Sequence, residues 1–150
     1  MDLRRLRAGE GICGVSGIAL LASLWLPWYA ADGATASGWE SLAIIDWVLA
    51  LLALAAIIVL IVTATSRGDA VPLALTSLTT LVAILGVLLA LLRVIDLPDP
   101  AEARRWGLWL GLAGALGVLG GGAVAMRDER REPPPPEISA FPPPRPKAPA

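Results

Sequence analysis

The stretch "GLWLGLAGALGVLGGGAVAM", Gly107 to Met126, is apolar throughout and contains no ionisable side chain. A helix of about 20 apolar residues is long enough to cross the roughly 30 Å hydrocarbon core of a bilayer. Lipid offers no water to backbone N–H and C=O groups, so such a segment must satisfy them internally as a helix. The stretch therefore predicts a membrane-spanning helix.

Small residues in this stretch recur four positions apart, on one face of the expected helix. One run is Ala113, Gly117, Gly121 and Ala125, and a second is Gly107, Gly111 and Ala115. Small side chains let helix backbones approach closely in lipid, where little hydrophobic drive is available. They predict a packing face, either inside the molecule or between two copies in a homodimer.

Three further apolar segments match this one in length. The four predicted spans are residues 11–29, 42–63, 72–95 and 107–126, in a chain that is 56% hydrophobic. Their short connections favour antiparallel neighbours. The expected fold is all-α, an integral membrane four-helix bundle over residues 11–126, preceded by a cytoplasmic N-terminus at 1–10 and followed by a tail at 127–150.

Lys and Arg are distributed unevenly between the two sides of these spans. One side holds nine of them: Arg4, Arg5, Arg7, Arg67, Arg127, Arg130, Arg131, Arg145 and Lys147. The other side holds Arg93, Arg104 and Arg105. The positive-inside rule then predicts a multi-pass protein of the plasma membrane with both termini in the cytoplasm.

Two terminal segments have particular readings. The basic start "MDLRRLR" and the small residues after Tyr29 also fit a cleavable signal peptide, although the apolar run is longer than usual for one. After Met126 the chain holds nine of its thirteen Pro and few large apolar groups. This composition predicts a disordered Pro-rich cytoplasmic tail, either a solvated spacer or a segment for a proline-binding partner.

The Trp residues and the single Tyr all fall at the predicted outer ends of the spans. These predicted interfacial anchors are Trp25, Trp28, Tyr29, Trp39, Trp47, Trp106 and Trp109. Amphipathic rings at headgroup depth fix the vertical position of membrane helices. An outward pocket lined by rings and carboxylates is the functional alternative, and the anchor reading does not explain why the rings occupy one side only.

Two charged residues lie within a turn of the same outer interface. Asp46 follows the start of the second span, and Arg93 precedes the end of the third. A charge at this depth is costly unless it snorkels to water or finds a partner. We expect an intramembrane pair between Asp46 and Arg93, with Asp96 as a competing partner and separate snorkelling as the alternative.

The residue types present exclude several kinds of chemistry. The chain has no His and one Cys, so it lacks the usual metal-ligand and nucleophile constellations, and we expect no catalytic residues, metal or cofactor. No basic stripe suggests a nucleic-acid partner. The remaining partners are the lipid bilayer, a membrane protein or second copy, and a cytoplasmic protein that binds the tail.

The motifs "LWLPWY", "SGWESL", "VPLALTSL", "LLRVID" and "RRWGLWLGLAGALGVLGGGAVAMRDE" follow one another over about residues 10–130. As a set they resemble uncharacterised small four-span membrane proteins of actinobacteria. The resemblance implies the same topology and compartment and supplies no activity. The sequence thus predicts a non-enzymatic membrane protein with a structural, scaffolding or sensing role, or, as an alternative, a small subunit of a transporter or channel.

Overall fold

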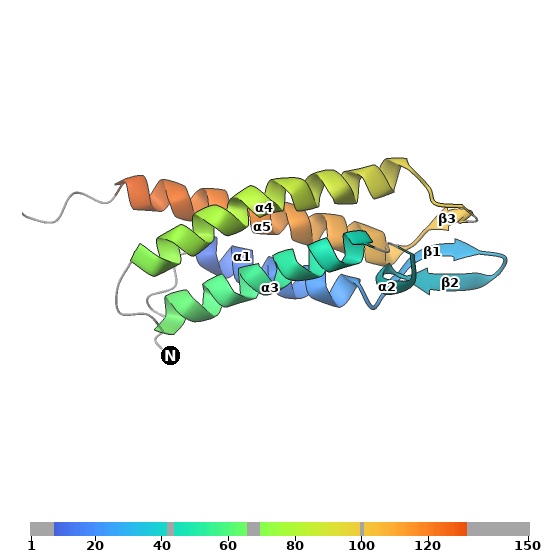
Figure 1. Cartoon of the computed structure of the whole chain (residues 1–150), viewed down its shortest axis with the longest axis horizontal. Helices are drawn as coiled ribbons and strands as arrows, with labels where there is room; N and C mark the ends of the chain where they lie inside the picture. The colour runs from blue at the N-terminus through green and yellow to red at the C-terminus, as the bar shows by residue number, and fades with distance from the viewer. Residues whose placement is uncertain (1–7, 42–43, 66–69, 100, 132–150) are drawn as a thin grey trace, which may run out of the picture.

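A computed structural model of the chain describes residues 8–41, 44–65, 70–99 and 101–131, without the side chains of 70–73 and 128–131. The described part is mostly helical and ends in a small sheet (Figure 1). The elements are α1 (Ala8–Ser23), β1 (Pro27–Ala31), β2 (Ala34–Ser37), α2 (Gly38–Ser41), α3 (Ile44–Thr65), α4 (Ala70–Ile95), β3 (Ala103–Arg104) and α5 (Trp106–Arg131).

The long helices α1, α3, α4 and α5 run side by side along the long axis of the molecule (Figure 1). α1 packs against both α5 and α3, and α4 packs against the same two helices. At one end the sheet and α2 extend beyond the helices, and we call the segments 27–41 and 96–105 the cap, as far as they are described. The opposite end holds the start of α1 and the end of α5.

Three of the four predicted spans correspond to helices that are long and apolar enough to cross a membrane: α3, α4 and α5. α3 begins at Ile44 and α4 at Ala70, within two residues of the predicted starts. α5 continues to Arg131, so the tail does not begin at residue 127 as predicted. Of the predicted N-terminus at 1–10, residues 8–10 belong to α1, and residues 1–7 lie outside the described residues, as do residues 42–43 and the tail from residue 132.

The first predicted span, 11–29, is wrong at its outer end. α1 covers Ala8–Ser23, and the chain turns over the next three residues into β1. Pro27 has no N–H to donate to a helix, and its ring disfavours helical geometry in the residue before it. Carbonyl groups in the last turn of α1 accept hydrogen bonds from side chains. Ser23 Oγ donates to Leu20 C=O at 2.6 Å, and Trp28 Nε1 donates to Ser23 C=O at 2.7 Å.

The all-α prediction is also incomplete, because the described cap contains a three-stranded antiparallel sheet in the order β2-β1-β3. The register of β1 against β2 shifts by one residue between Pro27 and Tyr29. Such a bulge places an extra residue, here Trp28, in one strand and breaks the alternation of side chains. Trp28 and Tyr29 are therefore consecutive and yet both buried.

Trp28 and Tyr29 consequently belong to the core and do not face lipid as interfacial anchors. The Trp28 indole lies on α5 where two glycines leave room for it: a methyl group added to Gly107 would lie 2.6 Å from Cδ1 of Trp28, and one added to Gly111 would lie 2.6 Å from Cζ2. Real Cβ atoms do not approach other atoms this closely. The Trp28 ring therefore occupies the space that the missing side chains of Gly107 and Gly111 leave.

The predicted small-residue face of α5 is used inside the molecule. A Cβ on Gly121 would lie 2.5 Å from Cys13 N, and one on Gly117 would meet Ser16, so both contact α1. Ala125 is buried at Gly9, and Gly114, which was not in the predicted set, approaches the backbone of Leu20 to 2.9 Å on the same measure. Ala113 is exposed and was wrongly included, because it lies one turn beyond the half-buried Gly117, outside the edge of the contact with α1.

We expect Gly111→Ala to destabilise the protein by about 1–3 kcal/mol, because the added methyl group overpacks the Trp28 ring. Gly120→Ala is the matched control, since a Cβ there meets nothing within 4 Å and alanine favours helix more than glycine. Thermal unfolding in detergent measures both. Equal unfolding temperatures for the two variants would contradict the conclusion that Gly111 leaves the space for the Trp28 ring.

Candidate functional site

The β1–β2 hairpin turns through Asp32 and Gly33, whose φ angles are 49° and 79°. Positive φ at both central residues is the geometry of a type I′ turn, for which Asp-Gly is a preferred sequence. This turn matches the twist of the strands and fixes their register. It brings the small residues of β2 opposite β1, with Ala31 paired to Ala34 and Ala30 to Thr35.

The short helix α2 follows the hairpin directly and is capped by its own residues. The Ser37 N–H donates to Glu40 Oε2 at 2.8 Å, and Ser37 Oγ donates to the same oxygen at 2.9 Å. These hydrogen bonds favour the ionised carboxylate and hold the pKa of Glu40 below its usual value of 4.5. Ser41 Oγ donates back to Ser37 C=O at 2.6 Å. Glu40 is thus a fixed negative charge in the cap.

The segment after α4 returns to the sheet and closes the other side of the cap. Glu102 N–H donates to Ala30 C=O, and Arg105 N–H donates to Trp28 C=O, both at 2.8 Å. The Arg104 side chain reaches back to the end of α4, where its Nε donates to Val94 C=O at 2.7 Å. A cation is favourable at a helix C-terminus, where carbonyl groups lack partners. The outer position of Arg104 therefore has a structural reason.

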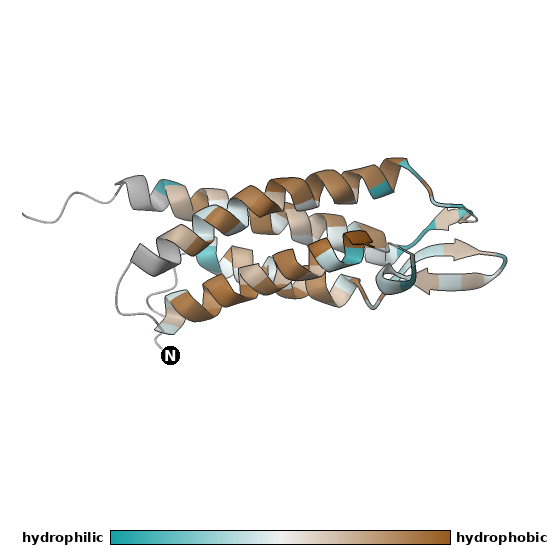
Figure 2. Cartoon of the chain, viewed as in Figure 1, coloured by the Kyte–Doolittle hydropathy of each residue, from teal (hydrophilic) through white to brown (hydrophobic). Residues whose placement is uncertain are grey.

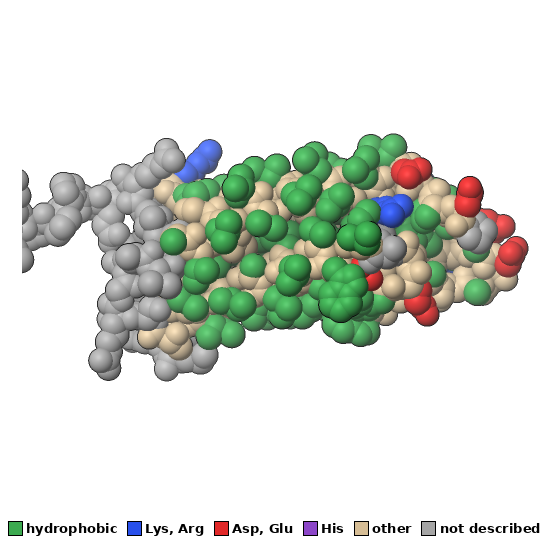
Figure 3. Space-filling model, viewed as in Figure 1, with side chains coloured by type: hydrophobic (Ala, Val, Ile, Leu, Met, Phe, Trp, Pro, Cys, Tyr) green, Lys and Arg blue, Asp and Glu red, His purple; other side chains and the backbone are tan. Residues whose placement is uncertain are grey.

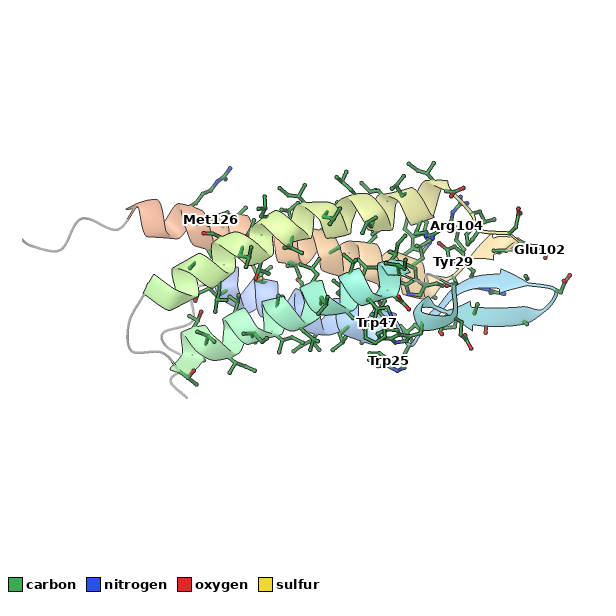
Figure 4. All side chains as sticks on the ribbon, in the orientation of Figure 1. Trp25, Tyr29, Trp47, Glu102, Arg104 and Met126 are labelled. Atoms are coloured by element: carbon green, nitrogen blue, oxygen red, sulfur yellow. The ribbon has the colours of Figure 1, made fainter. Side chains whose placement is uncertain are left out.

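Tyr29 ties the sheet to the same helix end. Its side chain is almost fully buried, and its hydroxyl donates to Arg93 C=O at 3.0 Å. Burial raises the pKa of the Tyr29 hydroxyl above 10.0, and the nearby Arg93 charge partly opposes that rise. Figure 4 labels Tyr29 beside Arg104 at this junction. The hydroxyl stays protonated at neutral pH and acts as a donor.

The structure describes the surroundings of both members of the predicted charge pair, Asp46 and Arg93. Asp46 is only 4% exposed, and its carboxylate accepts the Trp47 N–H at 2.7 Å, at the start of α3. Arg93 Nε is buried and has no hydrogen-bond partner among the described residues. Both residues lie near the cap end of the helices, as expected from their span positions. Direct pairing of Asp46 with Arg93 stays a prediction.

Three of the predicted anchors form a cluster at the base of the cap. Trp39 lies between Trp25 and Trp47, with ring centroids 5.5 Å and 5.6 Å away and edge-to-face angles of 66° and 74°. This arrangement is the favourable one for aromatic rings. Trp25 and Trp47 are each 63% exposed, and Trp106 and Trp109 are also exposed. Their role as interfacial anchors stays a prediction.

A pocket of about 300 Å³ lies between the hairpin, α2 and the segment that follows α4. Its lining is mostly small and apolar, with a few polar groups from α2 and the returning segment. The lining residues are Tyr29, Ala30, Ala31, Ala34, Thr35, Ala36, Glu40, Ser41, Pro98, Asp99 and Ala101. Volume and composition fit a small-molecule site better than a protein-binding surface.

An outward pocket lined by rings and carboxylates was the functional alternative to the anchors, and Tyr29 was among the named rings, but Thr35, Glu40, Ser41 and Asp99 were not predicted to line it. Two local signals were available: Asp32-Gly33 between short runs of β-compatible residues, and the S-x-x-E pattern from Ser37 to Glu40 that marks a capped helix start. Both were assigned to a loop because hydropathy placed them between two spans. Neither signal by itself indicates a pocket, since Pro98 and Asp99 come from a distant part of the chain.

Comparison with known proteins assigns no family. No protein-family model, curated protein or solved structure matches the chain. Among the described residues, no group of three or more His, Cys, Asp or Glu is arranged to hold a metal ion. The geometry of the cap and the surface of the helices are therefore the observations that bear on function.

The Ser37–Glu40 cap predicts a pH dependence that can be measured at one amide. Because the folded pKa of Glu40 is lowered, the stabilisation is present above pH 4.5 and is lost as the pH falls through the folded pKa. We expect the Ser37 amide chemical shift to titrate with a midpoint below 4.5 by NMR in detergent. In Glu40→Gln, the Ser37 amide should show no such titration, and a persistent one would assign it to another group.

Proposed function

We propose that the chain is a non-enzymatic integral protein of the plasma membrane, in which α1, α3, α4 and α5 all span the bilayer and the cap lies outside. The observation that carries the proposal is the apolar surface of every long helix. Large exposed apolar side chains include Ile12, Val15 and Ile18 of α1, Leu51, Leu54 and Ile58 of α3, Leu81, Leu85 and Leu88 of α4, and Leu116 and Val124 of α5.

This surface is too extensive for a water-soluble monomer, whose apolar patches are usually a few hundred Å². Figure 3 shows hydrophobic side chains along the visible face of the helices, while acidic side chains gather at the cap. Figure 2 shows the same contrast in hydropathy along the ribbon. Lipid around the helices and water around the cap would accommodate both surfaces.

α1 is the shortest of the four proposed spans. It has 16 residues and is therefore about 24 Å long, shorter than the hydrocarbon core. Its position between α5 and α3 places it at the same level as the longer helices. The turn that follows exposes Trp25 and Leu26, which extend its apolar surface toward the cap. Local thinning of the bilayer and interfacial side chains accommodate the remaining mismatch.

The proposed orientation rests on charge and on the ends of the helices. Most Lys and Arg belong to the sequence segments that precede α1, join α3 to α4 or follow Met126, and the positive-inside rule assigns these segments to the cytoplasm. The cap then faces outward with its pocket and its Trp25–Trp39–Trp47 cluster. A folded cap with these two surfaces suits a structural, scaffolding or sensing role, in which a partner or ligand is bound outside.

A transporter or channel subunit is the alternative suggested by hydroxyl groups in α4. Thr76, Thr79 and Thr80 are buried, and the Thr76 hydroxyl has no hydrogen-bond partner among the described residues. Thr80 Oγ1 donates to Thr76 C=O at 2.7 Å, and a Cβ on Gly122 would collide with Thr80. Such close packing of α4 on α5 favours the structural role over a conducting one.

Single cysteines at the two ends test the topology. In a Cys13→Ala background, Glu102→Cys places a thiol on the cap and Arg127→Cys places one at the opposite end, next to Met126 (Figure 4). We expect a membrane-impermeant maleimide to label Glu102→Cys in intact cells and Arg127→Cys only after permeabilisation. Labelling of both positions in intact cells would contradict the proposed topology.

Alanine substitutions test whether the Trp cluster binds a membrane partner. We expect the double variant Trp25→Ala, Trp47→Ala to lose proteins that co-purify after cross-linking in membranes, because it removes the two exposed rings of the cluster. Trp106→Ala, Trp109→Ala is the matched control with rings on another helix. Removal of residues 133–150 tests a tail partner separately. Unchanged partners in all three variants would leave the scaffolding role without support.

A further inference from the structure

The pocket in the cap has the size and construction of a site for a small molecule. Its walls come from three separate parts of the chain, namely the hairpin, α2 and the residues Pro98, Asp99 and Ala101. Each part is held independently: the hairpin by its type I′ turn, α2 by the Ser37–Glu40 hydrogen bonds, and the last by the Glu102 N–H bond to Ala30. The pocket is therefore formed before any ligand arrives, which limits the entropic cost of binding.

Methyl and methylene groups make up most of the pocket wall. Five alanines and Pro98 contribute no polar side-chain atom. The Tyr29 hydroxyl is already engaged with Arg93 C=O, so this lining residue offers no free side-chain donor to a ligand. A ligand that fits this wall needs a short apolar portion.

The charged groups at the pocket are both carboxylates. Glu40 and Asp99 line it, and no Lys or Arg among the described residues does. Both hydrogen bonds from Ser37 go to Oε2 of Glu40, which leaves Oε1 without a partner among the described residues. Thr35 and Ser41 add hydroxyl groups to the lining. A ligand that fits these groups needs a positive charge and hydrogen-bond donors.

We propose that this pocket binds a small organic cation, an alkylammonium group with a short apolar chain. The ammonium group would lie between the Glu40 and Asp99 carboxylates and donate to them, and the apolar chain would lie against the alanines and Pro98. An anion would meet two like charges there. A neutral apolar ligand would remove water from the carboxylates without replacing their hydrogen bonds.

A bare divalent cation is a poorer occupant of the same place. Calcium takes six to eight oxygen ligands in a flexible cage, and magnesium requires near-octahedral geometry. Two carboxylates on separate segments, in a wall made largely of methyl groups, supply neither arrangement. The apolar lining would make favourable contacts only with a ligand that contains carbon atoms.

The inference deepens the sensing role proposed above and rests on it only for the side of the membrane that the cap faces. Binding to the intact protein in detergent tests the pocket whether or not the topology is right. Failure of the cysteine labelling would therefore contradict the topology alone, and failure of binding would contradict the pocket proposal alone.

Three probes of the same shape test the chemistry: butylammonium, butan-1-ol and butyrate. In protein labelled with ¹³C at alanine methyl groups, we expect butylammonium to shift Ala34, Ala36 and Ala101 with a dissociation constant on the order of 1 mM. The buried Ala53 and Ala56 of the helices are internal controls and should not shift. Butan-1-ol and butyrate should bind at least about tenfold more weakly.

Charge-removing variants test the assignment of the two carboxylates. Glu40→Gln keeps an acceptor for Ser37, and Asp99→Asn keeps the side-chain shape; each should weaken butylammonium binding by about twofold to fivefold, and the double variant by about tenfold or more. Asp32→Asn is the matched control, because it removes one charge from the same hairpin, does not line the pocket and tolerates the positive φ. Ala34→Leu should abolish binding by filling the pocket.

The proposal is overturned by any of three results. One is butan-1-ol binding as tightly as butylammonium. Another is unchanged butylammonium binding in the Glu40→Gln, Asp99→Asn double variant while the Ser37 and alanine signals show an intact cap. The third is a loss in Asp32→Asn equal to the loss in Glu40→Gln, which would mean a diffuse field around the cap and no defined site.

Discussion

The contact on which the rest of the structure depends is the Trp28 indole on α5. The ring lies over Gly107 and Gly111, and its Nε1 donates to Ser23 C=O at the end of α1. The Trp28 side chain thus contacts the end of α1 and, through the bulge in β1, anchors the sheet. It holds both of these elements against α5. The backbone of the same residue also accepts Arg105 N–H, so the segment entering α5 is held at the same point.

Close backbone approach explains why the helices can hold this arrangement. Apolar side chains gain little from leaving lipid, so helices in a bilayer associate through dispersion contacts and need small residues where they cross. α5 meets α1 at Gly114 and Gly121, and α1 meets α3 at Gly14 and Gly17. α1 therefore lies between two neighbours at very short range, which stabilises the shortest of the four long helices without requiring more length.

Hydropathy predicted three helices well and failed at the end of the first. Windows of apolar residues locate α3, α4 and α5 because each contains a stretch of 22 residues that is apolar enough to cross a membrane. The same windows cannot separate burial in lipid from burial in protein, and so Trp25, which is exposed, and Trp28, which is fully buried, received the same role. Spacing of small residues identified the Gly107–Gly111 face but also included the exposed Ala113. The lining of the pocket could not be predicted, because it joins Glu40 to Asp99, which are far apart in the sequence.

The one-sided distribution of aromatic rings follows from what the cap is made of. Its strands contribute Ala30, Ala31, Ala34 and Ala36, which are too small to build a core under a sheet. The large rings of Trp28 and Tyr29 fill that space from within β1, and Trp39 is partly buried against the same core. No comparable layer is described at the opposite end, where the long helices continue alone. Three of the seven rings are therefore accounted for by packing, and only Trp25, Trp47, Trp106 and Trp109 retain the exposure that an interfacial anchor requires.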